Sequence, residues 1–207
     1  MDNILLLQKK IKRTKRAASV VTVLTAMYCL VLIVLPYIPA GVYFVKQFLS
    51  PTEEYALAGT IVIPSNVLLY KNEGKAMLVI PAIGVDKPII EADTIKEVHE
   101  NIWRRPQGSF PDMESNTVLV AHRYATIGGN RASTFYNLPK LVVGDRIYVT
   151  WEGSVYVYEV QETMTVEPTA IEVEEPTDET MLTLYTCTPL WTATHRFVVR
   201  APLLEII

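Results

Sequence analysis

Two kinds of hydrophobic pattern divide this chain. Residues 17–45 form a run of 29 positions without a charged side chain, whereas from residue 60 onward short apolar runs alternate with Gly, Pro, Asn and Asp. A helix over the first run would be about 43 Å long, enough for one tilted crossing of a hydrocarbon layer of about 30 Å and too short for two. We therefore expect a transmembrane helix over residues 17–45, a stalk over residues 46–59 and a β-rich domain over residues 60–207.

Basic residues gather ahead of the apolar run. Residues 1–16 contain six of the 19 Lys and Arg residues of the chain. Under the positive-inside rule this leader stays in the cytoplasm and the C-terminal domain emerges outside. A cleaved signal peptide is the alternative, but the apolar run is longer than a usual signal region and no small-residue cleavage site follows it closely. We predict an uncleaved, single-pass anchor in the cell membrane with an extracellular C-terminal domain.

Eight short runs rich in Val, Ile, Tyr and Thr predict strands in the outer domain. Residues 152–154 (Glu-Gly-Ser) predict a hairpin between two of them. Short helices are expected over residues 94–101 and 133–138. So many short strands in about 145 residues are typical of an all-β fold, either a closed barrel or a sandwich. The predicted strands are 60–64, 77–80, 87–90, 117–121, 146–151, 155–166, 181–187 and 196–201.

The charge of the outer domain excludes one class of partner. Residues 46–207 carry 13 basic and 21 acidic side chains, a formal charge of −8. A domain with this net negative charge has no reason to bind a nucleic acid by neutralising its phosphates. The basic leader flanks a membrane span and is better explained as a topology signal. We therefore expect a membrane partner and no nucleic acid.

The two cysteines lie in parts of the chain that cannot meet. Cys29 is in the apolar run and Cys187 is in the outer domain, so we expect no disulfide. A lone thiol in an exported domain is an oxidation liability. Cys187 ends the alternating run 181–187, which Pro189 terminates because proline cannot donate to a strand ladder. A buried structural cysteine is the simpler interpretation of such a residue, but the strand-end position favours a function.

A thiol becomes a useful nucleophile beside a base or a cation. Of the three histidines, His99 lies in a polar run and His195 adjoins the last strand, whereas His122 ends a predicted apolar strand. Arg196 follows Cys187 by nine positions, so its guanidinium can stabilise an oxyanion if the two strands are neighbours. A solvated histidine and a salt bridge at the rim are the simpler interpretations of His122 and Arg196.

Together these residues resemble the sortases, the membrane-anchored cysteine transpeptidases of bacteria that attach proteins to the cell envelope. Residues 183–187 (TLYTC) match the TLxTC signature, with an arginine nine positions on. Residues 120–123 (VAHR) look like the segment with the family's histidine, and residues 135–138 (FYNL) like its short helix. The resemblance covers about residues 60–205 and the anchor. It implies a closed, eight-stranded β-barrel with short helices.

The resemblance also implies roles and a reaction. Cys187 would be the nucleophile, His122 the general acid and base, and Arg196 the stabiliser of the oxyanion or substrate. The enzyme would cleave an LPxTG-like sorting motif of surface proteins through a thioacyl intermediate, and pass the acyl group to an amine of a peptidoglycan cross-bridge or a pilin lysine. The residues implied to bind substrate are Tyr185, Thr186 and Thr188.

Class, cofactor and metal follow from the same resemblance. Residues 102–106 (IWRRP) look like the housekeeping sortases of the D and E classes. The implied reaction needs no metal or organic cofactor. Some sortases bind calcium near the loop equivalent to residues 167–179, a stretch with six carboxylates, and oxygen-rich loops suit that ion. A solvated charged loop is the simpler interpretation, so we expect no metal site.

Two other functions agree with these residues. A membrane-tethered cysteine peptidase would use Cys187 and His122 and release the acyl group to water. A non-enzymatic envelope-binding β-domain would carry the same residues in degenerate form and would not depend on the thiol.

Overall fold

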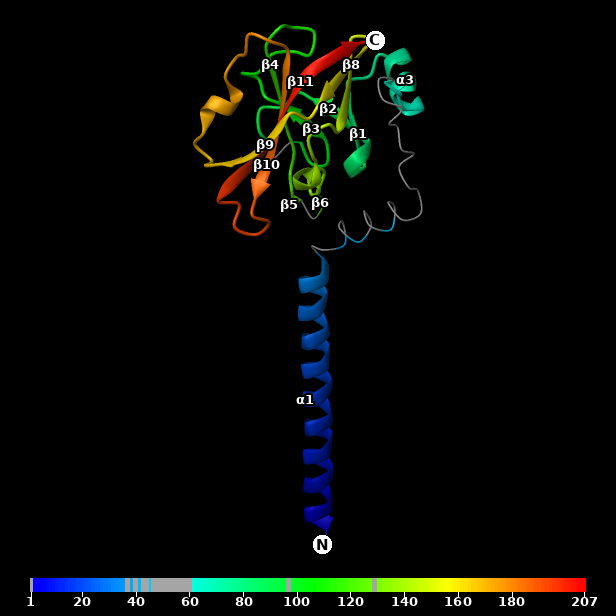
Figure 1. Cartoon of the computed structure of the whole chain (residues 1–207). Coiled ribbons are helices and arrows are strands. Elements are labelled where there is room, and N and C mark those ends of the chain that lie inside the picture. The colour runs from blue at the N-terminus through cyan, green and yellow to red at the C-terminus, as the bar shows by residue number, and fades with distance from the viewer. Residues whose placement is uncertain are drawn as a thin grey trace. The chain divides into compact units, whose positions relative to one another are not determined.

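The N-terminal part of the chain is one long helix. The computed structural model describes residues 2–35, 38, 41, 45, 61–95, 98–127 and 130–207. The chain divides into two compact units, Met1–Gly41 and Val42–Ile207. Helix α1 (Asp2–Val34) makes up the first, and its segment Lys12–Val34 is long and apolar enough to cross a membrane (Figure 1). This fits the predicted anchor, whereas the predicted stalk, residues 46–59, lies outside the described residues.

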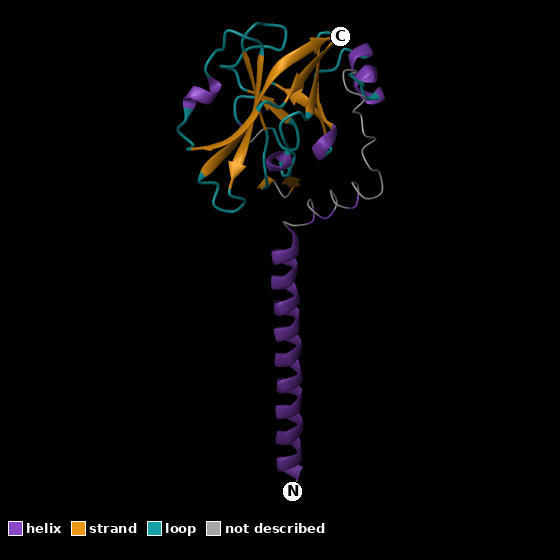
Figure 2. Ribbon diagram, in the orientation of Figure 1, coloured by secondary structure: helices purple, strands orange, loops and turns teal. Residues whose placement is uncertain are grey.

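Eight strands of the second unit close into a barrel (Figure 2). They are β1 (Met77–Ile80), β2 (Val85–Ile90), β3 (Ile102–Arg104), β4 (Asn116–Val120), β7 (Arg146–Trp151), β8 (Ser154–Glu159), β10 (Met181–Thr188) and β11 (His195–Ile206). Their order is β10-β4-β3-β2-β1-β7-β8-β11, and the pairing of β11 with β10 completes the circle. The pairs β10–β4 and β2–β3 are parallel and the others antiparallel. The predicted closed, eight-stranded fold is confirmed.

The remaining strands and helical segments are not part of the closed barrel. β9 (Glu162–Val166) pairs with the first half of β11, and β5 (Ala125–Ile127) pairs with β6 (Asn130–Ala132) in a separate small hairpin. The helical segments of this unit are short. Among the described residues they include α3 (Ser65–Asn72), η2 (Pro81–Ile83), η4 (Leu138–Lys140) and η5 (Ile171–Glu174).

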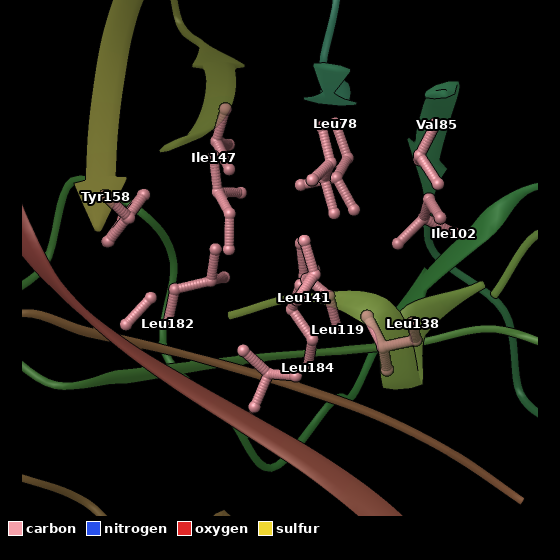
Figure 3. Close-up of a cluster of buried hydrophobic side chains, with 14 of the residues drawn as sticks. Leu78, Val85, Ile102, Leu119, Leu138, Leu141, Ile147, Tyr158, Leu182 and Leu184 are labelled. Carbon is pink, nitrogen blue, oxygen red and sulfur yellow. The ribbon is translucent and has the colours of Figure 1, made fainter. Parts of the chain in front are cut away.

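The core fills the inside of the barrel with branched side chains (Figure 3). On β10, Leu182 and Leu184 are fully buried in it, and Leu184 lies opposite Leu119 of β4. Burial of one such leucine contributes about 1.5–3 kcal/mol to folding. Because side chains alternate between the two faces of a strand, these two leucines turn the odd-numbered residues of β10 to the outside of the barrel.

A second apolar cluster lies on that outer face of the sheet. Its buried residues are Val98, Trp103, Val118 and Val120, and Tyr185 of β10 packs against it. The outer face near Cys187 is therefore itself partly covered.

One predicted strand is wrong. Residues 61–64 form no strand and lead into α3, which begins after Pro64. Ile61 and Ile63 pack instead against a small cluster with Val67 and Tyr148, and the Tyr148 hydroxyl donates to the Val62 carbonyl at 2.9 Å. The two isoleucines there are partly buried without joining a ladder, while Val62 is exposed.

The strand predicted over residues 155–166 is two strands. β8 and β9 both pair with β11, but they are separated at Val160. The Val160 N–H donates to the Asp145 carbonyl and its own carbonyl accepts from the Gly144 N–H, so this residue leaves the β11 ladder for the turn before β7. A run of alternating apolar residues does not reveal such a change of partner.

The local predictions had mixed outcomes. The β7–β8 hairpin is confirmed, with a two-residue turn in which Glu152 (φ 46°) and Gly153 (φ 75°) both adopt positive φ. The helix predicted over residues 94–101 is wrong for the described residues, where Ile95 alone is helical. The helix predicted over residues 133–138 is a turn that leads into η4. The three-residue strand β3 was missed because it is too short for a periodic pattern.

Candidate active site

Cys187 and Arg196 are direct partners across two strands. In the antiparallel pair β10–β11 they lie opposite each other, as was expected if these strands were neighbours. Side chains of such partners lie on the same face of the sheet. Cys187 is a free, partly exposed thiol near the end of β10. Arg196 Nη1 donates to the carbonyls of Ala193 at 3.2 Å and His195 at 3.0 Å, so this part of the guanidinium holds the loop between the two strands.

His122 approaches from the opposite side of β10. The parallel pair β10–β4 places Tyr185 opposite Val120. The Thr186 hydroxyl donates to the Ala121 carbonyl at 2.8 Å, which continues this alignment beyond the end of β4. One further step of this alignment would bring His122 to the level of Cys187. The three candidate residues thus come from three adjacent segments at one edge of the barrel.

The environment of His122 favours the neutral imidazole. Burial lowers the pKa of His122, the hydrogen bond to the Ile95 carbonyl opposes this, and His99 adds a smaller lowering. The His122 Nε2 atom lies 3.0 Å from the Ile95 carbonyl oxygen, which can only accept, so Nε2 carries the hydrogen. In the neutral ring the free lone pair is then on Nδ1. The Phe135 N–H donates to the His122 carbonyl at 3.0 Å and fixes the backbone.

The Tyr185 hydroxyl binds a carboxylate that also forms an ion pair, in addition to the packing of its ring in the outer cluster. Its hydroxyl donates to Glu174 Oε1 at 2.5 Å, and Arg105 Nε donates to Glu174 Oε2 at 3.0 Å. Burial, with a contribution from the Glu174 hydrogen bond, raises the pKa of Tyr185 well above its usual range. Tyr185 is therefore a neutral hydrogen-bond donor, and it ties η5 to the face on which Cys187 lies.

A buried amide fixes the same loop. Asn116, at the start of β4, is 1% exposed. Its Nδ2 donates to the carbonyls of Val173 at 3.1 Å and Glu175 at 3.0 Å, and its Oδ1 accepts from the Thr183 hydroxyl at 2.7 Å. Both amide hydrogens and the amide oxygen are thus used, which is what a buried polar group requires.

The predicted substrate-binding residues have three different surroundings. Tyr185 is held by Glu174 as described above. Thr186 is 1% exposed and bound to the Ala121 carbonyl, which favours a role in joining β10 to β4 over direct contact with substrate. Thr188 ends β10, and its Oγ1 accepts a hydrogen bond from Arg123 Nη1 at 2.6 Å. Substrate contact by these residues stays a prediction.

Sequence reasoning missed several residues that shape this edge. Asn116 binds the Val173 carbonyl over 57 positions and Arg105 binds Glu174 over 69 positions, separations that no local pattern reveals. The sequence indicates no role for Arg123 beyond its place after His122 in residues 120–123.

The acidic stretch 167–179 is partly engaged by the protein itself. Glu174 binds Arg105 and Tyr185, and Glu167 lies 3.1 Å from His195 Nε2. Among the residues that the structure describes, no group of three or more His, Cys, Asp or Glu side chains is arranged to hold a metal ion. The expectation that this loop binds no metal stays a prediction.

Comparison with known proteins decides the family. Residues 78–204 match the family model of the sortase domain. The chain belongs to the sortase family. Sortases as a family are cysteine transpeptidases.

Individual sortases are moderately similar to this one. Sortase A of Listeria monocytogenes is 27% identical over 146 residues, a match that covers 69% of this chain and 54% of that protein, or about half of the relative's length. A Clostridium perfringens sortase D5 transpeptidase has a TM-score of 0.56 and 28% identity, with 69% of this chain and 90% of that chain covered. Sortase E1 from Streptomyces coelicolor has a TM-score of 0.55 and 27% identity, with 64% and 89% covered.

Overall similarity does not separate the sortase classes. Structures named sortase A, C, D and E all resemble this chain, with TM-scores from 0.52 to 0.57. The class prediction made from residues 102–106 therefore stays a prediction.

Proposed function

We propose that this sortase cleaves an LPxTG-like sorting motif through a thioacyl intermediate on Cys187 and transfers the acyl group to an amine. One observation carries the proposal. Cys187 lies opposite Arg196 on one neighbouring strand and, by continuation of the parallel alignment, beside His122 on the other. A thiol, an imidazole and a guanidinium at one sheet edge are the groups that acyl transfer needs.

The proposed first half-reaction is attack on a backbone carbonyl. The Cys187 thiolate bonds to the carbonyl carbon of the motif's Thr, and the negative charge moves to the carbonyl oxygen. Arg196 stabilises this oxyanion with N–H groups other than those of Nη1, which hold its own loop. The C–N bond then breaks, and protonated His122 gives its proton to the departing amine, which leaves a neutral imidazole and a thioester.

The second half-reaction reverses these roles. An amine attacks the thioester carbon, neutral His122 takes the amine proton on Nδ1, and Cys187 leaves as the thiolate. The His122 imidazole is then protonated again and can donate a proton in the next cycle. Because burial favours neutral His122, the structure supports its use as the base in this half-reaction most directly.

The proposed partners follow from membership of the sortase family. Surface proteins with a sorting motif would supply the acyl group, and a peptidoglycan cross-bridge or a pilin lysine would supply the amine. The apolar segment Lys12–Val34 would anchor the enzyme in the cell membrane, with the basic leader in the cytoplasm and the barrel outside. We favour a housekeeping role, on the resemblance of residues 102–106 to the D and E classes.

The test uses the full chain in detergent micelles with a fluorescent LPxTG peptide. Mass spectrometry should show a thioester-sized increment on the Cys187 peptide, which added hydroxylamine removes as the hydroxamate and an added diamino acid removes as the amide. Cys187→Ala should show neither. Hydrolysis alone across a broad panel of amines would identify a peptidase and overturn the transferase proposal, and absence of any adduct across a panel of motifs would overturn the covalent mechanism.

A further inference from the structure

The hydrogen-bond acceptor of His122 lies on an irregular segment. Ile95, whose carbonyl oxygen is 3.0 Å from His122 Nε2, belongs to residues 91–95, which follow β2 and form no strand. The bond spans 27 positions of sequence, so no local geometry of the chain keeps the two groups together. A backbone carbonyl outside a strand ladder fixes a ring only if other contacts hold its own segment in place. The orientation of the imidazole therefore depends on the groups that hold residues 91–95.

Strand β3 holds the first part of this segment. Trp103 Nε1 donates to the Ala92 carbonyl at 2.9 Å. The next residue, Arg104, donates from Nε and Nη2 to the two carboxylate oxygens of Glu91 at 2.6 and 2.7 Å, which is a bidentate pair. Trp103 and Arg104 are 6% and 5% exposed, so water does not readily replace a lost partner. Two consecutive residues of β3 thus fix two consecutive residues of the segment.

The outer cluster holds the other end of the segment. Ile95 packs against the buried group that contains Trp103 and Val98, and Ala92 packs against the same group. The Ile95 carbonyl also accepts a hydrogen bond from the Val98 N–H at 3.3 Å, and Val98 is fully buried. The carbonyl that binds His122 is therefore anchored both through its own side chain and through a second backbone donor.

Trp103 also lies next to the strand that leads to His122. In the antiparallel pair β3–β4 it is opposite Val120, two positions before His122. In the parallel pair β2–β3 it is opposite Ile90, the last residue before the segment 91–95. In the sheet order, β3 thus lies between the strand that leads to the imidazole and the strand that leads to its acceptor.

We propose that Trp103 is a positioning residue for His122: its indole N–H holds the segment whose Ile95 carbonyl binds Nε2, which leaves Nδ1 on the other side of the ring for proton transfer. This inference rests on the proposed function of His122 as acid and base. Trp103 acts through Ile95 and not by contact with the substrate. The role is comparable to that of a group that orients a metal-binding or catalytic histidine through the nitrogen that does not react.

The experiment follows the ring hydrogen itself. In the ¹⁵N-labelled full chain in detergent micelles, imidazole spectra report how fast the His122 Nε2 hydrogen exchanges with water at neutral pH, and the signal is assigned by its loss in His122→Gln. Trp103→Phe keeps an aromatic ring in the cluster and removes the indole N–H. It should accelerate this exchange about 3- to 10-fold, the change expected when one buried hydrogen bond of the segment is lost. The backbone N–H of Leu119 on β4 should keep its exchange rate.

Two further variants separate positioning from general packing. Ile95→Ala keeps the accepting carbonyl but removes the side chain that packs against the cluster, and it should accelerate the exchange in the same way. Trp151→Phe on β7 removes the indole N–H of another partly buried tryptophan and should leave the exchange unchanged. Urea unfolding checks that each variant is folded, and if Trp103→Phe is not, Ile95→Ala decides in its place.

The kinetics of transfer to an amine give a second measurement. In Trp103→Phe the kcat should fall about 3- to 10-fold, because small displacements of a catalytic group are costly. The KM for the motif peptide should stay within about twofold, because the groups that contact the peptide are unchanged.

The outcomes are distinct. Unchanged exchange in the deciding variant overturns the inference, as does the absence of a protected Nε2 hydrogen in the parent chain. An equal acceleration at Leu119, or in Trp151→Phe, would show general loosening and also overturns it, and so does a parent-like kcat despite faster exchange. Formation of the peptide adduct by the unmodified chain is scored separately. If that adduct fails to form while Trp103→Phe still accelerates the exchange, the proposed function fails and the placement of the His122 ring by Trp103 stands.

Discussion

Thr183 donates its hydroxyl hydrogen to Asn116 Oδ1 at 2.7 Å, across the parallel strands β10 and β4. Through the two Nδ2 bonds of Asn116, this contact extends to the carbonyls on either side of Glu174. The first residue of the TLYTC segment is thus connected to the acidic loop that covers the cysteine's face of the sheet. A buried hydrogen-bond network of this kind destabilises the folded protein when some of its donors or acceptors have no partner.

Asn116→Ala should therefore destabilise the barrel by about 1–3 kcal/mol, because it leaves two loop carbonyls and the Thr183 hydroxyl without their buried partner. Thr183→Val should cost a similar amount. The two losses should not add, and a double-mutant cycle should give a coupling energy of about 0.5–3 kcal/mol. Urea unfolding of the full chain in micelles, followed by tryptophan fluorescence, measures this. Strict additivity would show that the two side chains act independently.

Arg196→Ala should reduce the rate of peptide cleavage by about 10²–10³-fold, the loss typical of a removed oxyanion donor. Arg196→Lys should recover only part of it, because an ammonium lacks the planar fork of the guanidinium. The initial rate of release of the amine fragment checks both variants, with Arg200→Lys on the same strand as the matched control. Wild-type rates for Arg196→Ala would remove this residue from the proposed mechanism.

His122 should make folding stability depend on pH. Because burial lowers its pKa below the ordinary 6.5, the unfolded chain binds this proton more tightly than the folded chain. Its contribution to stability is therefore complete above pH 6.5 and is lost as the pH falls from 6.5 to the lower folded value. His122→Gln should reduce the slope of unfolding free energy against pH in that window. The same slope in both proteins, from urea midpoints at matched pH, would contradict this.

Tyr185→Phe tests the connection between the strand and η5. The variant loses the hydrogen bond to Glu174 but keeps the ring in the outer cluster, and it should destabilise the protein by about 1.5–3 kcal/mol, the usual contribution of a bond to a charged group. The peptide bonds near Glu174 should also become more sensitive to a Glu-specific protease. Arg105→Met should produce the same sensitivity, because it removes the second partner of that carboxylate. A wild-type digestion rate in both would show that η5 is held by its other contacts.

Local patterns in the sequence predicted much of the secondary structure of this protein. The uncharged run predicted the apolar helix, because a membrane-spanning helix needs many consecutive apolar residues and nothing else. Alternation in residues 181–187 predicted a strand with Cys187 on the face away from Leu182 and Leu184, as the structure has it. The nine-position spacing from Cys187 to Arg196 fitted an antiparallel return, and the two residues are indeed partners. Each of these predictions depends on residues close together in the chain.

The tertiary structure decided everything that depends on which strands become neighbours. The parallel pairing of β10 with β4 brings His122 and Arg123 to the side of Cys187 and Thr188, and no spacing in the sequence encodes that choice. Ile61 and Ile63 carry strand-like side chains, yet they pack against α3 instead of pairing. The sequence by itself determined the apolar helix and most strands of the barrel, and it identified Cys187, His122 and Arg196 as the candidate reactive groups. Barrel closure determined which charges surround the thiol, because burial and electrostatic interaction depend on distance in space rather than along the chain.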